Sequence, residues 1–381
     1  MAPAGSTTTA TATATVSLIF FVLSLSAITN VRSCTVGDRN ALLAFKSALT
    51  ESQFGIFKTW RGTDCCKSWY GVHCNPSSKR VTEISLRGES PESSVPTLEK
   101  MGRSGYMTGV ITPAICKLDR LSTIIIADWK GISGNIPKCI TTLSFLRVLD
   151  LVGNQFSGPI PYNIGRLHRL TVLNFADNQI NGVIPSSTVQ MSSLMHLDLR
   201  SNKITGEIPT EFGNLKMLSR ALLSKNLISG SIPSSISKIY RLADLDLSVN
   251  QLSGSIPESF GRMPVLSTLN LDMNKLSGEI PTTLLSGSGI SILNLSRNAL
   301  EGKIPDVFGE RSYFTALDLS YNNLKGPIPK SVTSASYIGH LDLSHNHLCG
   351  PIPNGAPFNH LEASSFMNND CLCGSPLKRC T

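Results

Sequence analysis

Charged and aromatic side chains are both scarce in this chain. Charged residues make up 16% of its 381 positions and aromatic residues 6%, and no segment carries a dense run of lysine and arginine. Nucleic-acid-binding surfaces usually need such runs, so the sequence argues against a nucleic-acid partner. The formal net charge of +8 is scattered. It leaves two interpretations, an ordinary solvated surface or a mild attraction to an acidic polysaccharide.

Long apolar runs are lacking outside one short stretch near the N-terminus. Val16–Ile28 is apolar but too short to span a bilayer comfortably, and the small residues Val31 and Ser33 precede Cys34. We predict that residues 1–33 are a signal peptide for secretion. The Ser/Thr-rich, uncharged start leaves a plastid transit peptide as the alternative. With no second apolar run and no anchor signal before Thr381, we expect neither a transmembrane anchor nor a kinase domain.

Groups typical of a catalytic or metal site are also lacking. His196–Asp198 and His340–Asp342 each bring a histidine beside an acid, but no serine or cysteine nucleophile matches them. His345–His347 has no further ligands, and the cysteines do not have zinc-ligand spacing. We therefore expect no enzymatic activity, no metal site and no cofactor.

What the chain does contain is a strict repeat. Ten glycines, each opening a Gly-x-Ile-Pro unit, recur at one constant interval: Gly134, Gly158, Gly182, Gly206, Gly230, Gly254, Gly278, Gly302, Gly326 and Gly350. Nine asparagines keep the same interval: Asn154, Asn178, Asn202, Asn226, Asn250, Asn274, Asn298, Asn322 and Asn346. A constant period of this length predicts a stacked solenoid, in which each coil contacts only its neighbours.

One coil, residues 146–161, illustrates the expected structure. Leu149 and Leu151 alternate with period two, so a short strand turns them into the core and its other side chains outward. Asn154 turns the chain and can bond backbone groups that would otherwise be buried without a partner. Pro161 blocks a longer strand or helix, and the return path runs as short 3₁₀ turns. Stacked coils then form a parallel sheet on the concave side of a curved superhelix.

This pattern resembles the plant extracellular leucine-rich repeat, LxxLxxLxLxxNxLxGxIPxxLxx, over residues 81–353. The resemblance implies an N-terminal cap at 34–80, which carries DRNALLAFK and DCCKSWYGVHC, and a C-terminal cap at 354–381. Within this class the chain is similar to the plant proteins named for DNA-damage repair and toleration, through residues 102–109, 127–131, 298–302 and 358–363. It is similar, more distantly, to the polygalacturonase-inhibiting proteins of the cell wall.

The resemblance also implies a cysteine pairing and a place of action. By analogy with the family caps, Cys34 pairs with Cys65, Cys66 with Cys74, Cys349 with Cys371 and Cys373 with Cys380. Cys116 and Cys139 lie on successive coils and are candidates for a bridge between them. Disulfide-stapled caps agree with an oxidising compartment, so we expect a secreted, extracellular or cell-wall protein. The family name implies a nuclear or plastid role, which no nucleotide-binding loop or basic groove in the sequence supports.

The repeat is interrupted near its start. The interval from Leu86 to Gly109 is more than three times the corresponding interval from Leu151 to Gly158. We expect residues 87–108 to contain a loop beside the first coil, followed by ten regular coils of the constant period. Lys130 is expected to replace the turn asparagine.

A partner is expected on the outward positions of the concave strands. One column reads Ile126, Asp150, Asn174, Asp198, Leu222, Asp246, Asn270, Asn294, Asp318 and Asp342. It is either a solvated ladder or a polar track for an extended ligand. Apolar positions with an aromatic anchor and flanking arginines are typical of a binding hot spot. The candidate patch contains Ile124, Ile126, Trp129, Val148, Asp150, Val152, Val172, Asp177, Asp198, Arg200, Arg220 and Lys225, although Trp129 alternatively packs against the inserted loop.

Function therefore reduces to two binding hypotheses. The first is a secreted recognition protein that binds a protein or peptide, including as one version an inhibitor of a microbial or plant wall enzyme. The second is a structural wall protein held by acidic pectin. Asn294 begins a proline-free N-x-Ser sequon, which is either a glycosylation site that would obstruct the C-terminal half of the concave face or a by-product of the repeat.

Overall fold

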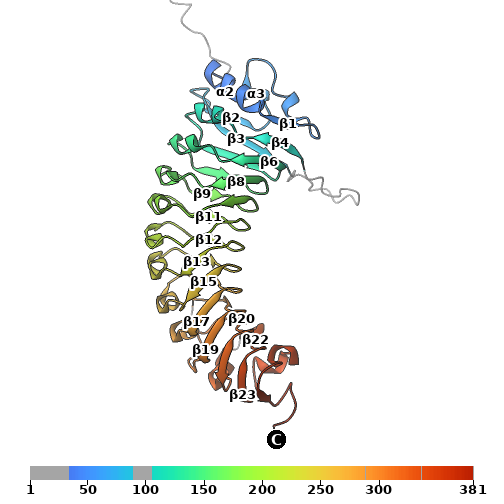
Figure 1. Ribbon diagram of the computed structural model, residues 1–381, viewed down its shortest axis with the longest axis vertical. Helices are drawn as coiled ribbons and strands as arrows, with labels where there is room; N and C mark the ends of the chain where they lie inside the picture. Colours follow the sequence, from blue (N-terminus) through green and yellow to red (C-terminus); the bar gives the residue numbers. More distant parts are fainter. Residues whose placement is uncertain (1–33, 89–104, 288, 336, 381) are drawn as a thin grey trace, which may run out of the picture.

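The computed structural model describes residues 34–88, 105–287, 289–335 and 337–380. The predicted signal peptide (1–33) and the middle of the predicted insertion (89–104) lie outside these residues. The described coils stack into one curved column, with the N-terminal cap at one end and the C-terminal cap at the other (Figure 1). Within the described ranges, no helix has the length and apolar character needed to cross a membrane.

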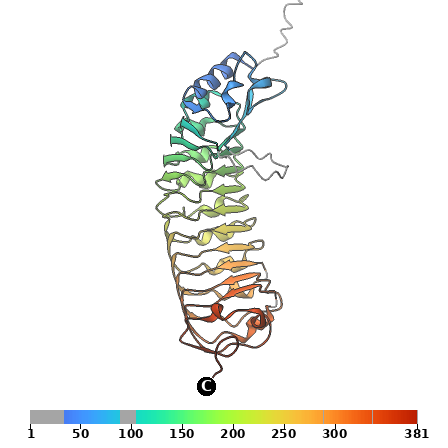
Figure 2. The same ribbon diagram turned by 90° about the vertical axis from the view of Figure 1, so that its right-hand side faces the viewer.

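The concave side is a sheet of twelve strands, which runs the length of the column. Its strands pair in parallel from β3 onward, and only the cap strand β2 pairs antiparallel with β3. Figure 2 shows them stacked in sequence order. They are β2 (Val72–Cys74), β3 (Val81–Arg87), β5 (Thr123–Ala127), β7 (Val148–Asp150), β9 (Val172–Asn174), β11 (His196–Asp198), β12 (Arg220–Leu222), β14 (Asp244–Asp246), β16 (Thr268–Asn270), β18 (Ile292–Asn294), β20 (Ala316–Asp318) and β22 (His340–Asp342).

Two further sheets lie beside the concave sheet, one after the other along the column, where the sequence predicts only turns. They form because the residues after each turn asparagine stay extended up to the Gly-x-Ile-Pro unit, next to the same segment of the neighbouring coil. The five-stranded sheet contains β1 (Leu49–Glu51), β4 (Met107–Val110), β6 (Lys130–Asn135), β8 (Gln155–Pro159) and β10 (Gln179–Asn181). The seven-stranded sheet contains β13 (Ser229–Ser231), β15 (Gln251–Gly254), β17 (Lys275–Glu279), β19 (Ala299–Lys303), β21 (Asn323–Gly326), β23 (His347–Pro351) and β24 (Cys371–Cys373).

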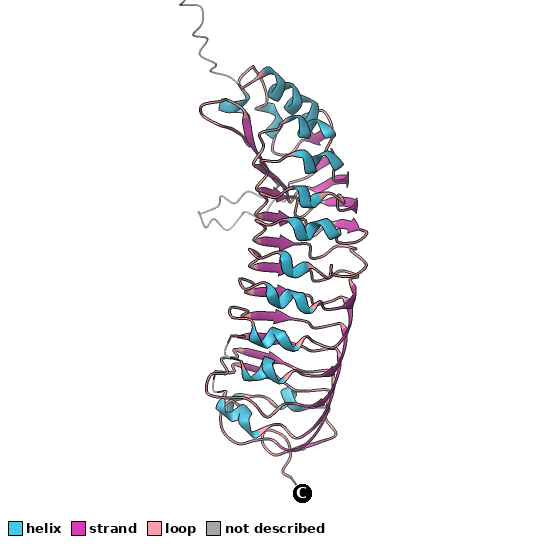
Figure 3. Ribbon diagram, turned by 90° about the vertical axis from the view of Figure 1, so that its left-hand side faces the viewer, coloured by secondary structure: helices cyan, strands magenta, loops and turns pink. Residues whose placement is uncertain are grey.

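Short helical turns complete the coils, as the prolines predict, and Figure 3 shows them stacked along one side of the column. Most are 3₁₀ turns: η2 (Ile56–Lys58), η3 (Pro113–Lys117), η4 (Lys138–Thr142), η5 (Ile164–Arg166), η6 (Ser186–Gln190), η7 (Phe212–Asn214), η8 (Ser234–Lys238), η9 (Glu258–Arg262), η10 (Lys330–Ser334), η11 (Phe358–His360) and η12 (Ala363–Phe366). The α-helices are α2 (Val36–Lys46), α3 (Cys65–Ser68) and α4 (Thr282–Ser286).

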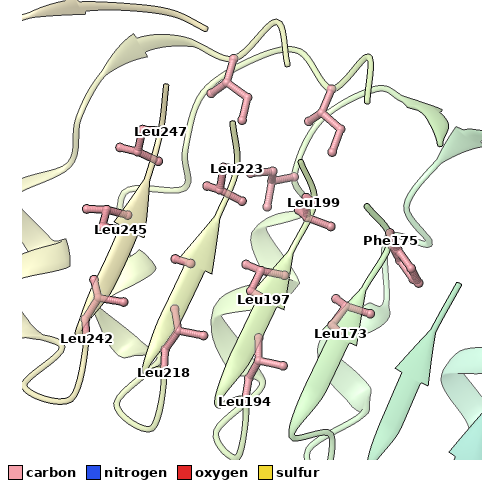
Figure 4. Packing of buried hydrophobic residues seen from close by; sticks show 14 of the residues in the cluster. Leu173, Phe175, Leu194, Leu197, Leu199, Leu218, Leu223, Leu242, Leu245 and Leu247 are labelled. Atoms are coloured by element: carbon pink, nitrogen blue, oxygen red, sulfur yellow. The ribbon is translucent and has the colours of Figure 1, made fainter. Parts of the chain in front are cut away.

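Leucines and asparagines hold successive coils together. The inward strand residues, such as Leu173, Leu197 and Leu245, stack in rows between the sheet and the return path, and they are at most 1% exposed (Figure 4). The amide nitrogen of Asn202 donates to Phe175 O of the preceding coil at 2.8 Å, and its oxygen accepts from Ile180 N at 2.9 Å. The turn asparagines therefore satisfy backbone groups in their own coil and in the one before.

In the second coil, the strand register differs from the predicted one. Ile124 pairs with Leu149 and Ile125 with Asp150, so one extra residue lies between this strand and the next. Ile124 and Ile126 are consequently wholly buried, and Ile125, instead of Ile126, lies in the outward column. The regular glycine spacing concealed this slip because the turn before Gly134 absorbs it.

Trp129 is not part of the exposed surface, so its place in the predicted patch is wrong. Its side chain is wholly buried, its ring meets Phe54 edge-on at 6.0 Å, and its Nε1–H donates to Leu86 O at 3.1 Å. That bond matches the one from Asn154 to Ile126 O in the next coil. Trp129, and not Lys130, thus takes over the donor role of the turn asparagine. As a wholly buried residue it cannot anchor a partner.

The described ends of the predicted insertion lie together. Gly88 donates from its backbone N to Ala127 O, and Gly105 N donates to Gly88 O. Met107 and Thr108 already belong to β4, which pairs with β6 and with the cap strand β1. The backbone on both sides of this segment, at Gly88 and at Gly105, is therefore bonded into the first coils.

All ten cysteines form disulfides. The four cap pairs that the family resemblance implies are present, Cys34–Cys65, Cys66–Cys74, Cys349–Cys371 and Cys373–Cys380. Cys116 and Cys139 also pair, and they join the 3₁₀ turns η3 and η4 of successive coils. These pairings confirm the predictions.

Candidate functional site

The middle of the concave sheet presents a row of side chains in strict register. Val148 pairs with Val172, Val172 with His196, His196 with Arg220, and Arg220 with Asp244, across five consecutive strands. Because the strands are parallel and unshifted here, each side chain lies directly beside its neighbour on the same face. We name the set Val172, His196, Asp198, Arg200, Arg220 and Asp244 the central concave patch.

Carboxylates orient the arginines of this face. Arg220 Nε lies 3.1 Å from Asp244 Oδ2, and Arg200 Nη2 lies 3.4 Å from Asp198 Oδ2. Both arginine side chains remain about half exposed, at 51% and 46%. A guanidinium held on one edge by a carboxylate keeps its other N–H groups available to a ligand. The central concave patch therefore offers fixed donors to a partner.

Burial controls the charge of the patch. It lowers the pKa of His196, and the charge of Arg220 lowers it further. Burial raises the pKa of Asp198, against the opposing effect of the backbone N–H of Arg200. His196 is consequently neutral at neutral pH, where its ring offers one donor and one acceptor. With its arginines paired to carboxylates, the patch presents hydrogen-bonding groups with little net charge.

The other predicted site residues divide by exposure. Asp177 and Lys225 are exposed at left-handed turn positions, with φ of 54° and 55°, on the rim of the concave face. Val148 and Val152 are half-buried on the face itself. Asp150 is only 9% exposed and pairs with Arg87, at 3.4 Å between Nη2 and Oδ2.

Sequence reasoning missed some surface residues. Asp244, which lies 3.1 Å from Arg220, was not predicted. His196 was considered only as a catalytic residue, and it was rejected because no nucleophile matches it. Arg297, Tyr321 and His345 occupy the left-handed turn position of three successive coils and form a stack, with His345 3.8 Å and the Arg297 guanidinium 3.9 Å from the Tyr321 ring centre. Their recurrence at the interval of the repeat was the available signal.

Two other predicted features have defined positions. Asn294 lies half-buried in β18, and its Oδ1 accepts from both the backbone N and the Oγ of Ser296; its glycosylation stays a prediction. Within the described residues, the one group with metal-ligand chemistry is Cys34, Cys65 and Cys66, and all three sulfurs belong to disulfides.

Comparison with known proteins identifies repeats along most of the column. The model described as leucine rich repeat N-terminal domain matches residues 37–75. Leucine rich repeat models match 144–204 and 168–228, and then 241–263, 289–310, 313–335 and 338–357. The central concave patch therefore lies on matched repeats.

Among curated proteins, the chain is 58% identical to the Arabidopsis thaliana DNA damage-repair/toleration protein DRT100 over 140 residues, 36% of this chain and 37% of that protein. It is 32% identical to the Vitis vinifera polygalacturonase inhibitor over 119 residues, 31% of this chain and 30% of that protein. The matched segments thus span only about a third of these relatives' own length.

Among solved structures, the chain is similar to the ectodomain of the Arabidopsis thaliana receptor kinase GASSHO1/SCHENGEN3, solved with CASPARIAN STRIP INTEGRITY FACTOR 2. The TM-score is 0.73 at 28% identity, over 88% of this chain and 38% of that one. It is also similar to a plant ice-binding protein, with a TM-score of 0.67 at 27% identity over 92% and 99% of the two chains. The chain is a leucine-rich-repeat protein of the plant type.

Proposed function

We propose that this is a secreted plant recognition protein that binds a peptide or protein ligand on the central concave patch. The observation that carries the proposal is the in-register row of His196, Arg220 and Asp244 on a rigid sheet. Donors and acceptors fixed before binding lose little conformational freedom when a ligand arrives. The GASSHO1/SCHENGEN3 ectodomain, a fold neighbour, was solved with CASPARIAN STRIP INTEGRITY FACTOR 2, which supports a ligand-binding use of this architecture.

A narrower version of the proposal is defence. The relative named polygalacturonase inhibitor supports the idea that the ligand is a microbial wall hydrolase, and that the protein works in the cell wall. The relative named for DNA-damage repair and toleration supports an intracellular alternative. The five disulfides favour the extracellular version, because reducing compartments do not maintain such bonds.

Affinity capture with matched variants tests the ligand proposal. The chain from Cys34 onward, secreted with its disulfides intact, is used to capture proteins from plant wall extract, and the affinity of each captured protein is then measured. His196→Ala with Arg220→Ala should weaken a true partner by tenfold or more, since hot-spot residues typically contribute about 1–4 kcal/mol each. Lys238→Ala with Arg262→Ala, on the helical side, is the control. If a captured partner bound the concave variant and the control variant with equal affinity, the central concave patch would not be its binding site.

The inhibitor version has its own assay. Purified protein should slow the hydrolysis of pectin by a microbial polygalacturonase, and the His196→Ala, Arg220→Ala variant should not. An unchanged rate at saturating protein would contradict the inhibitor version while leaving peptide recognition open. Recovery of tagged protein only inside cells would contradict secretion.

A further inference from the structure

A second surface with ligand-binding chemistry lies beside the concave sheet, at the N-terminal third of the column. It is a hollow of about 840 Å³ along the residues that immediately precede β3, β5, β7 and β9. Figure 1 shows these strands in the N-terminal part of the column. Four arginines reach it, Arg80, Arg120, Arg147 and Arg169, and the aromatic ring between them is Phe145. We name these five residues and their hollow the arginine groove.

The guanidiniums of the arginine groove are held in place by the ring. The guanidinium carbons of Arg120 and Arg169 lie 4.9 Å and 5.2 Å from the centre of Phe145. Arg120, Phe145 and Arg169 occupy the same position of three successive coils, shortly before each strand begins. Stacking restrains a flexible arginine but leaves its in-plane N–H groups free to bind an oxyanion in bidentate fashion. The groove is therefore pre-organised.

Only part of the positive charge is balanced. Arg80 contacts Asp119 and lies 2.9 Å from the buried Asp38, and Arg120 is 3.8 Å from Asp119. Among the described residues, no carboxylate lies within ion-pairing distance of Arg147 or Arg169. Two guanidiniums thus remain without an internal counter-charge. Carboxylates of a ligand could pair with these two guanidiniums and balance their charge.

The arginines are particular to this end of the molecule. Further along the column, the position of Phe145 is taken by Ser193, Met217, Arg241, Val265, Gly289, Tyr313 and Tyr337, and the position of Arg147 is taken mainly by small residues. The arginine groove is therefore not a by-product of the repeat. It is a local feature of three coils and the cap.

The lining favours a peptide over a nucleic acid or a sugar chain. Two guanidiniums already stack on Phe145, the one aromatic ring among the described residues of the lining, so it is a poor platform for a base. Ser122 Oγ and Thr171 Oγ1 already donate to Thr82 O and Arg147 O. Their lone pairs therefore face a ligand as acceptors, which suits peptide N–H groups. Carboxylates for the arginines and N–H groups for the hydroxyls are both present in an acidic peptide.

We propose that the arginine groove binds an acidic segment, rich in Asp or Glu, of the protein whose main contact is the central concave patch. The inference rests on the proposed function for the source of that segment. Arg147 and Thr171 directly precede β7 and β9, so the groove is continuous with the outward positions of those strands. One partner can reach both surfaces, and its acidic segment fixes its orientation and speeds its encounter.

A direct binding assay tests the proposal. The probe is a fluorescent peptide that alternates Glu and Ser, and its reference is the same peptide with Gln in place of Glu. The Glu peptide should bind the native protein, the Gln peptide should not, and added salt should weaken binding through screening. Arg147→Gln with Arg169→Gln should weaken binding about tenfold or more. Arg241→Gln, at the corresponding position outside the groove, should leave it unchanged.

Three results would overturn the proposal. They are absence of binding by the native protein, equal binding by the Arg147→Gln, Arg169→Gln variant, and tighter binding of an oligogalacturonate to the same arginines. The His196→Ala, Arg220→Ala variant should bind the Glu peptide like the native protein. If that variant loses a captured partner while the native protein ignores the Glu peptide, the arginine groove fails and the concave proposal stands. If the Glu peptide binds the arginine groove but no captured partner depends on the central concave patch, the concave proposal fails and the groove remains a site for acidic peptides.

Discussion

At the scale of single residues, Trp129 shows how a repeat can change a side chain and keep its bond. A turn asparagine such as Asn178 donates to the preceding coil and also accepts from Phe156 N at 2.9 Å. The indole of Trp129 has a donor but no acceptor, so it reproduces only the first bond. In the described residues, Asn154 Oδ1 is buried without a hydrogen-bond partner. We attribute this to the extra residue of the second coil, which displaces the amide that would reach it.

Replacing Trp129 tests its structural role. Trp129→Phe removes the hydrogen bond to Leu86 O and leaves that carbonyl buried, so the free energy of unfolding should fall by about 1–3 kcal/mol. Trp129→Ala should cost about 3–5 kcal/mol, because it also opens a cavity. Urea unfolding measures both. Weaker partner binding by Trp129→Phe at unchanged stability would contradict this role and restore Trp129 as a contact residue.

Asp272 gives a pH-dependent prediction of defined sign. Burial raises its pKa above the ordinary value of 3.8, and the carboxylates of Asp246 and Asp318 raise it further. Between 3.8 and the raised value the folded state holds more protons than the unfolded state, so stability falls as pH rises through this window. Asp272→Asn should therefore stabilise the protein at neutral pH, by less than about 1 kcal/mol because the side chain is only half-buried.

The control for this experiment is a carboxylate of opposite behaviour. Hydrogen bonds from Ser331 lower the pKa of Asp306, so its charged form stabilises the fold above pH 3.8. Asp306→Asn should accordingly destabilise the protein at neutral pH. Thermal unfolding from acidic to neutral pH measures both variants, and the two differences should shrink toward zero in acid. If both substitutions changed the stability at neutral pH in the same direction, the causes assigned to the two pKa shifts would be wrong.

At the scale of elements, the period of the sequence predicts most of the fold. Alternating leucines give the strands, prolines give the short return turns, and the Asn and Gly positions give the bends. The flanking sheets could not be predicted this way. Residues 155–159, for example, form β8 through pairing with the neighbouring coils, and their composition (Gln, Phe, Ser, Gly, Pro) has little strand preference of its own.

The candidate site was harder to predict than the fold. Outward positions follow from the strand pattern, so Arg200 and Arg220 were found. A one-residue slip reverses which face a side chain occupies, however, and it moved Ile124 and Ile126 into the core. The arginine groove was missed because its members belong to separate coils, and only the stacking of those coils brings them together.

At the scale of the whole molecule, the solenoid must seal both ends of its core. At the C-terminus the cap continues the hydrogen bonding of the coils without adding a strand to the concave sheet. Leu343 N donates to Ser365 O at 2.8 Å, and Asn369 repeats the role of a turn asparagine by donating to Leu343 O and accepting from Leu348 N. Phe366, wholly buried beside Phe358, covers the last coil.

Removing this cap should loosen the column from one end only. A chain that stops after Pro353, with Cys349→Ser to avoid a free thiol, uncovers Leu341, Leu343 and Leu348. It also loses the hydrogen bond that Ser365 O accepts from Leu343 N, and those that Asn369 makes with Leu343 and Leu348. Since the stability of a solenoid is a sum over coils and their neighbour contacts, hydrogen exchange should speed up in β20 and β22 and stay unchanged in β9 and β11. The full-length Cys349→Ser, Cys371→Ser variant separates the loss of the disulfide from the loss of the cap. Equal acceleration along all the coils would show instead that the column unfolds as a single cooperative unit, and that its caps and its binding surfaces are energetically inseparable.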